Sequence, residues 1–80
     1  MKTWDDILTR YYIDEVRIYW LKGGEYCLVE VLGSRILRKR VKAARVNYIR
    51  MKLLEHGFIP ADSGDDEEVW IPITDLDPLA

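Results

Sequence analysis

Residues 15–32 have the sequence Glu-Val-Arg-Ile-Tyr-Trp-Leu-Lys-Gly-Gly-Glu-Tyr-Cys-Leu-Val-Glu-Val-Leu, and the other elements can be placed outward from them. Apolar side chains alternate along both halves of this stretch, as is typical of strands with one buried face. Gly23 and Gly24 supply the positive φ angles that a tight turn requires. The stretch therefore predicts a β-hairpin, with Trp20, Val29 and Val31 facing the core.

A helix is expected immediately before the hairpin, over residues 3–13. Thr3 is a good N-cap, and Asp6 three residues later completes a capping box. This helix should pack on the sheet, because apolar side chains follow at the spacing of one helical face. They are Trp4, Ile7, Leu8, Tyr11 and Tyr12.

The segment after the hairpin allows two interpretations. In the first, Gly33-Ser34 is a second turn, residues 35–40 form a third strand and a helix runs from about 41 to 56. In the second, Ser34 caps one helix over residues 35–56. Periodicity favours the long helix, but its first turns would place several bases at the positive end of the helix dipole. We favour three strands. The periodic apolar side chains are Leu37, Val41, Ala44, Tyr48 and Met51.

Gly57 is expected to end this helix as a left-handed residue. Phe58 and Ile59 then begin another strand, and residues 62–68 form an acidic loop. Residues 69–73 predict a last strand, either at an edge of the sheet or beside residues 58–60. Residues 74–80 are expected to form a tail.

The sequence thus predicts a single small α+β domain over residues 1–80. It combines an N-terminal helix, a small, mainly antiparallel sheet (a β-meander plus a C-terminal strand) and one long basic helix. One core is feasible in a chain of 80 residues, although it is thin. The expected core comprises Ile7, Leu8, Tyr11, Val16, Ile18, Trp20, Val29, Val31, Val41, Ala44, Tyr48, Met51 and Ile71.

Charge is divided unevenly along the chain. Residues 31–54 contain eight Lys or Arg and no acid, whereas residues 55–80 contain eight Asp or Glu and neither Lys nor Arg. The net charge of −2 therefore conceals a strong charge separation. Such a separation bears on the partners of a protein rather than on its fold.

The basic segment, residues 35–52, predicts a small nucleic-acid-binding module without enzymatic activity, because cations on one face neutralise phosphates and release counterions. Five of its eight bases are Arg, whose guanidinium suits bidentate phosphate contacts. The acidic C-terminal stretch would limit affinity or exclude wrong ligands. The candidate nucleic-acid-binding residues are Arg35, Arg38, Lys39, Arg40, Lys42 and Arg45.

The alternative is a protein-interaction subunit, accessory factor or inhibitor. The same charged face would meet an acidic protein, or the acidic stretch of a second copy in a homodimer, and aromatic side chains would anchor the contact. A pI of about 5.3 favours this alternative, because dedicated nucleic-acid binders tend to be basic. Neither function implies a cofactor, a membrane or a small-molecule substrate.

The order helix, three-strand meander, helix over residues 3–56 resembles the double-stranded-RNA-binding domain. In that family a Lys-rich motif at the start of the second helix contacts phosphates, and residues 37–45 occupy the corresponding place. The family's Gly-x-Gly-x-Ser-Lys-Lys approach is absent, and the meander is shorter. Residues 53–58 are similar to small toxin endoribonucleases of this fold, whose Gly-Ser-His segment has no counterpart here. We assign the chain to no family.

The sequence contains no catalytic constellation. His56 is the only histidine, and its position predicts a role at a helix C-terminus. Cys27 is in phase with buried strand residues, and a single cysteine fits a reducing, cytoplasmic setting. The acidic loop lacks the ligand spacing of a calcium site, so no metal is expected. We expect neither a secretory signal nor a membrane span.

Overall fold

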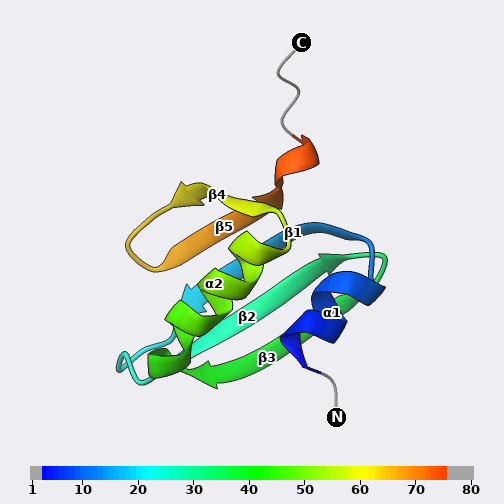
Figure 1. The fold of residues 1–80 in the computed structure, drawn as a ribbon. Helices are drawn as coiled ribbons and strands as arrows, with labels where there is room; N and C mark the ends of the chain where they lie inside the picture. The colour runs from blue at the N-terminus through cyan, green and yellow to red at the C-terminus, as the bar shows by residue number, and fades with distance from the viewer. Residues whose placement is uncertain (1–2, 76–80) are drawn as a thin grey trace.

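The computed structural model describes residues 3–75 and shows two short helices lying on one face of a five-stranded sheet (Figure 1). In chain order its elements are α1 (Trp4–Arg10), β1 (Ile13–Trp20), β2 (Tyr26–Gly33), β3 (Ile36–Lys42), the 3-10 turn η1 (Ala43–Arg45), α2 (Val46–Glu55), β4 (Phe58–Ser63), β5 (Glu67–Pro72) and the 3-10 turn η2 (Ile73–Asp75). Neighbouring strands are antiparallel, in the order β3-β2-β1-β5-β4. The predicted α+β class is confirmed.

The hairpin predicted from residues 15–32 forms as β1 and β2. Val16 pairs with Val31 across the two strands, and their turn contains Gly23 and Gly24 at φ 94° and 74°. The capping box of α1 is also present, since the Asp6 N–H donates to Thr3 Oγ1 over 3.2 Å. The helix itself ends at Arg10, earlier than the expected residue 13.

Residues 36–42 form the third strand, as favoured from the sequence, and they pair with β2 along their whole length. Glu30 lies opposite Arg38, so the pairing places opposite charges side by side. The predicted long basic helix is overstated. Only ten residues form α2, preceded by the three of η1, and the bases up to Lys42 lie on a strand or in the turn before it.

The buried face of α2 differs from the predicted one. Val46, Ile49 and Leu53 are at most 2% exposed and face the sheet. Tyr48 and Met51, expected in the core, are 43% and 59% exposed, and Ala44 is exposed as well. The predicted stripe assumed one helical phase from Leu37 onward, and a strand followed by a 3-10 turn interrupts that phase.

The remaining core follows the strands. Of the expected residues, Ile7, Leu8, Val16, Ile18, Val29 and Val31 are buried, and Tyr11, Trp20 and Val41 are partly buried against them. Ile71 is only half-buried. Cys27, whose phase predicted its burial, is buried as well. Residues absent from the prediction complete the core, and they are Ile13, Val46, Ile49, Leu53, Phe58 and Trp70.

The C-terminal part forms a second hairpin, in which β5 pairs with both β1 and β4. Of the two placements considered for residues 69–73, pairing with residues 58–60 is confirmed, whereas the edge placement is wrong, because β5 lies between β1 and β4 and β4 forms the edge. Only Gly64–Asp66 separates the two strands, so the acidic loop expected over residues 62–68 is shorter than predicted. Of the tail expected over residues 74–80, residues 76–80 lie outside the described part of the chain.

The sheet has one face covered by α1 and α2 and one face over which residues 3–75 place no helix, here called the open face (Figure 1). Successive side chains of a strand point to opposite faces, so the neighbours of buried residues belong to the open face. By this alternation the open face carries Glu15, Arg17 and Tyr19 from β1, Tyr26, Leu28, Glu30 and Leu32 from β2, and Ile36, Arg38, Arg40 and Lys42 from β3.

Candidate nucleic-acid interface

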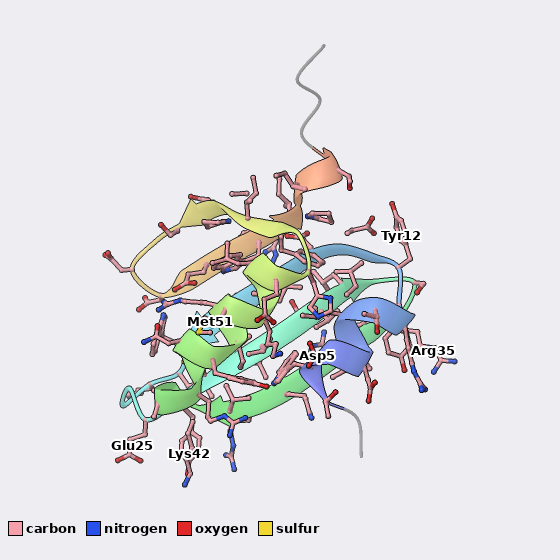
Figure 2. The ribbon with its side chains drawn as sticks, viewed as in Figure 1. Asp5, Tyr12, Glu25, Arg35, Lys42 and Met51 are labelled. Atoms are coloured by element: carbon pink, nitrogen blue, oxygen red, sulfur yellow. The ribbon has the colours of Figure 1, made fainter. Side chains whose placement is uncertain are left out.

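Four of the six candidate cations lie on β3, which is an edge strand of the sheet. Arg35 lies in the turn before this strand and Arg45 in η1 after it. Figure 2 shows Arg35 and Lys42 at opposite ends of β3, both pointing away from the body of the molecule. The six residues therefore follow one edge of the sheet from end to end, here called the basic edge.

Three cations of the basic edge, Arg38, Arg40 and Lys42, belong to the open face. Arg40 lies over the Tyr26 ring, with 4.8 Å between the guanidinium carbon and the ring centroid. Arg38 donates from Nε to Glu30 Oε2 over 2.7 Å. Lys42 has no ion pair or ring contact within residues 3–75. These three side chains share one face with Tyr26 between them and β1.

The other three candidates point elsewhere. Lys39 lies on the helix-covered side, with Nζ 5.8 Å from the Trp4 ring centroid. Arg35 approaches the ring of Tyr11 at 5.9 Å. Arg45 lies 5.0 Å from the Tyr48 ring of α2. The six candidates therefore share an edge but not a single face.

Most of the basic edge is not neutralised by the acids that the structure describes. Within the described residues, only Arg38 among the six candidates has a carboxylate partner. Arg35, Lys39, Arg40 and Arg45 contact aromatic rings instead, and a ring leaves the positive charge in place. These cations keep their charge available to an anionic ligand.

The bases of α2, in contrast, are held by acids. Arg50 is hydrogen-bonded to Glu68 of β5, with Nε donating to Oε1 over 3.1 Å and NH2 donating to Oε2. The hydrogen bonds from Arg50 lower the pKa of Glu68. Lys52 lies 3.1 Å from both Asp5 and Glu55. Arg50 and Lys52 therefore hold α2 against the sheet and α1, and their charges are already paired with carboxylates.

The acidic stretch is separated from the basic edge by the order of the strands. β4 and β5 lie on the far side of β1, so β2 and β1 stand between them and β3. Within the described residues, the acids of β5 that meet bases are Glu68 with Arg50 and Glu67 with Arg17. Neither pair involves a candidate residue.

His56 is placed where the sequence predicts it, at the end of α2, but its side chain contacts α1. Its Nε2 lies 2.9 Å from Asp5 Oδ1, and Asp5 lies between the two helices in Figure 2. Hydrogen bonds from His56 and Lys52 lower the pKa of Asp5. No local pattern indicates this contact, because 51 positions separate the two residues. The arrangement links α1 to α2.

Other chemistry is sparse in the described part of the chain. Cys27 is fully buried, and that burial raises the pKa of its thiol. Residues 3–75 contain no group of three or more His, Cys, Asp or Glu side chains that would hold a metal ion. None of the described helices is long and apolar enough to cross a membrane.

The candidate residues chosen from the sequence are all cations and do not include the aromatic and acidic residues beside them. Tyr26 and Glu30 lie half-buried on the open face, next to Arg40 and Arg38. The signal was present in the hairpin, because both residues are out of phase with the buried Cys27 and therefore point away from the core.

No protein-family model matches the chain, and comparisons with curated proteins and with solved structures find no match either. The resemblance to the double-stranded-RNA-binding domain gains no support from them. The basic residues up to Lys42 also precede the second helix instead of opening it. The case for a function therefore depends on the residues themselves.

Proposed function

We propose that this protein is a small, non-enzymatic nucleic-acid-binding module that contacts phosphates through the basic edge. The observation that carries the proposal is the set of cations along β3 and its two ends that have no acidic partner within residues 3–75. Phosphate neutralisation by such cations supplies most sequence-independent affinity.

The proposal assigns the contacts to a strand and not to a helix. Alternate residues of a strand are about 6.8 Å apart, so Arg38, Arg40 and Lys42 present three charges in a regular row. Arg35 and Arg45 extend the row at its ends. Arg guanidinium groups suit this use, because they bind phosphate oxygens through two parallel hydrogen bonds.

Binding is tested with a fluorescein-labelled oligonucleotide by anisotropy, over a series of salt concentrations starting at about 50 mM. Three to four phosphate contacts predict a log–log slope of about −2 to −3 for a single strand. Arg40→Gln combined with Lys42→Gln should reduce the magnitude of that slope by about 1.4. Absence of binding to any oligonucleotide at this salt concentration refutes the proposal.

The matched control removes the same charge elsewhere. Arg10 and Lys22 are exposed and lie outside the basic edge, on α1 and in the β1–β2 turn. Arg10→Gln combined with Lys22→Gln should therefore leave the slope close to that of the unmodified protein. An equal loss in both double variants would mean that net charge, and not the basic edge, determines binding.

A second candidate function is a protein-interaction subunit, and the outward face of α2 favours it. Tyr48, Met51 and Leu54 are 43%, 59% and 56% exposed, which is unusual for large apolar side chains of one short helix. In an antiparallel pair of α2 helices centred near residue 50, Arg45 would face Glu55 of the second copy. This complementarity suits a homodimer.

Sedimentation velocity at two salt concentrations tests the homodimer. Met51→Asp should convert a concentration-dependent dimer into a monomer, because it places a charge in the apolar contact. Tyr12→Ser is the control, since Tyr12 is 70% exposed and lies far from α2 on the link between α1 and β1 (Figure 2). A protein that is monomeric at every concentration removes the homodimer.

A further inference from the structure

We infer that the open face is a binding site for single-stranded nucleic acid, in which a base stacks on Tyr26 while phosphates lie along Arg38, Arg40 and Lys42. This inference rests on the proposed function and gives it a ligand class and a face. It depends on three observations. Acids hold the bases of α2, aromatic side chains lie beside the row of Arg38, Arg40 and Lys42, and those aromatic side chains are outside the core.

Recognition of a duplex groove requires an element that can enter it with free polar side chains, usually an α-helix or a two-stranded ribbon. The α2 helix is poorly suited to bind in a duplex groove, because Arg50 is paired with Glu68, and Lys52 is paired with Asp5 and Glu55. Its outward face is largely apolar. The free cations lie instead on a strand at the border of a broad sheet face.

Tyr26 is the aromatic side chain in direct contact with the basic row. Arg40 covers one part of its ring at 4.8 Å, and Lys42 is its cross-strand neighbour on β3. The ring is half-buried and is no part of the core. A base stacked on this pair would gain both aromatic and guanidinium contact, while its phosphate would lie near two cations.

A second stacking position lies one strand further in. Tyr19 of β1 pairs with Leu28 of β2, and Leu28 pairs in turn with Arg40 of β3. Tyr19 and Tyr26 are therefore diagonal neighbours on the same face. Two tyrosines and one leucine beside a row of three cations combine the aromatic platform and the charged track that single-strand binders use.

The remaining charges of the open face favour a ligand that stays close to β3. Arg17 is held by Glu15 at 2.9 Å and approaches Glu67 at 3.8 Å, so its charge is already compensated. Glu30 lies between Arg17 and Arg38. A strand of nucleic acid would therefore run along the outer side of this face and extend its bases inward over Tyr26.

Anisotropy with a 12-nucleotide single strand and a 12-base-pair duplex of the same sequence tests the inference. We expect the single strand to bind at least tenfold more tightly at about 50 mM salt. Tyr26→Leu should weaken single-strand binding by about 5- to 150-fold, because one stacked base contributes about 1–3 kcal/mol. Its effect on duplex binding should be below twofold.

The control is Tyr12→Leu, which removes a 70% exposed ring beside Gly33, at the opposite end of β2 from Tyr26, and should leave both affinities unchanged. Equal affinity for single strand and duplex, or an equal effect of Tyr26→Leu on both, overturns the inference and leaves the proposed function standing. Binding of neither ligand overturns the proposed function itself.

Photo-crosslinking of a 5-bromouridine oligonucleotide to the unmodified protein gives a measurement that does not depend on a variant. Peptide mapping should find the adduct at Tyr26 or Tyr19. Adducts confined to α1 and α2 would place the nucleic acid on the helix-covered side and contradict the inference.

Discussion

The main chain at Gly33 passes directly against the carbonyl group of Tyr12. A Cβ atom at this position would lie 1.9 Å from the Tyr12 oxygen and 2.8 Å from the Ile13 Cα. Both are backbone atoms, so no side-chain rotation relieves the contact. The same region carries the hydrogen bond from the Ser34 N–H to that oxygen over 2.9 Å, which fixes the start of β1 beside the end of β2.

Gly33→Ala should therefore lower the free energy of unfolding by at least about 2 kcal/mol, as overpacking of a rigid site does. Urea denaturation measures the change. Gly64→Ala is the control, because the nearest atom to its added Cβ is 4.0 Å away. It should change stability by less than about 0.5 kcal/mol. Similar losses in both variants would contradict this account of Gly33.

Glu30 is the acid that competes with an anionic ligand for the basic edge. Its carboxylate accepts a hydrogen bond from Arg38 at 2.7 Å and another from the Tyr19 hydroxyl at 3.4 Å. Glu30→Gln keeps an acceptor for Tyr19 but removes the charge beside Arg38. It should tighten nucleic-acid binding about two- to fivefold, which corresponds to one partly exposed ion pair.

The comparison for that prediction is Asp14→Asn, which removes an exposed charge of β1 without touching Arg38. Anisotropy titrations of both variants at one salt concentration decide the point. Unchanged affinity in Glu30→Gln would contradict the competition of Glu30 with the ligand for Arg38, and an equal gain in Asp14→Asn would mean that net charge accounts for the effect.

At the scale of elements, the contact between α2 and β5 depends on a carboxylate on the helix-covered face. Glu68 accepts hydrogen bonds from Arg50 and from the Trp70 indole N–H, and its side chain is only 12% exposed. Glu68→Gln should lower the free energy of unfolding at neutral pH by about 1–2 kcal/mol, since water partly screens the Arg50 side of the pair.

The pH dependence of this contribution has a definite sign. The folded state lowers the pKa of Glu68 below its ordinary value of 4.5, so the unfolded state takes up the proton first. The contribution is full above pH 4.5 and declines as the pH falls through the folded pKa. The stability difference between the unmodified protein and Glu68→Gln should shrink accordingly. A difference independent of pH from 7 to 3 would contradict this role of Glu68.

The orientation of α2 is tested by two truncations on opposite sides. Ile49→Ala should cost about 2–5 kcal/mol, because Ile49 is 1% exposed and its removal leaves a cavity. Met51→Ala should change the stability of the monomer by less than about 0.5 kcal/mol, because Met51 is 59% exposed. Thermal unfolding at low protein concentration compares the two, and the reverse order would mean that α2 is rotated.

Parts of the fold, but not the orientation of α2, could be predicted from the sequence. The hairpin, the capping box of α1 and the third strand follow from local signals, namely alternation, Thr3 with Asp6, and bases unfavourable at a helix start. The buried side of α2 does not, because Val46, Ile49 and Leu53 form a shorter apolar ridge than Ala44, Tyr48 and Met51 do with Leu37. Tertiary contact with the sheet selects the shorter ridge.

The candidate interface was predictable to a similar degree. The cations were evident as a run of bases, but their direction depended on whether residues 36–42 formed a strand or a helix. A strand sends Arg38 and Arg40 to the open face and Lys39 to the other. The contacts of Arg50 with Glu68 and of Asp5 with His56 join positions far apart in the chain, so no local sequence pattern predicts them.

At the scale of the whole molecule, the fold converts a division of charge along the chain into a division across the sheet. The basic edge lies at β3, and the acidic hairpin of β4 and β5 lies at the other side. Because strands are about 4.8 Å apart, the loop Gly64–Asp66 is at least about 14 Å from β3. An anionic ligand approaching this field is directed toward the basic edge.

This separation predicts how the acidic loop acts on nucleic-acid binding. The screening length is about 8 Å at 0.15 M salt and about 30 Å at 0.01 M. Asp65→Asn combined with Asp66→Asn should therefore alter affinity by less than about twofold at the higher salt concentration and raise it by several-fold at the lower. Substitution is the suitable change, because truncation at residue 61 would remove β5, which pairs with β1. Anisotropy titrations at the two salt concentrations measure the effect. A large gain in affinity at 0.15 M would mean that the acidic loop reaches the basic edge directly, contrary to the order of the strands.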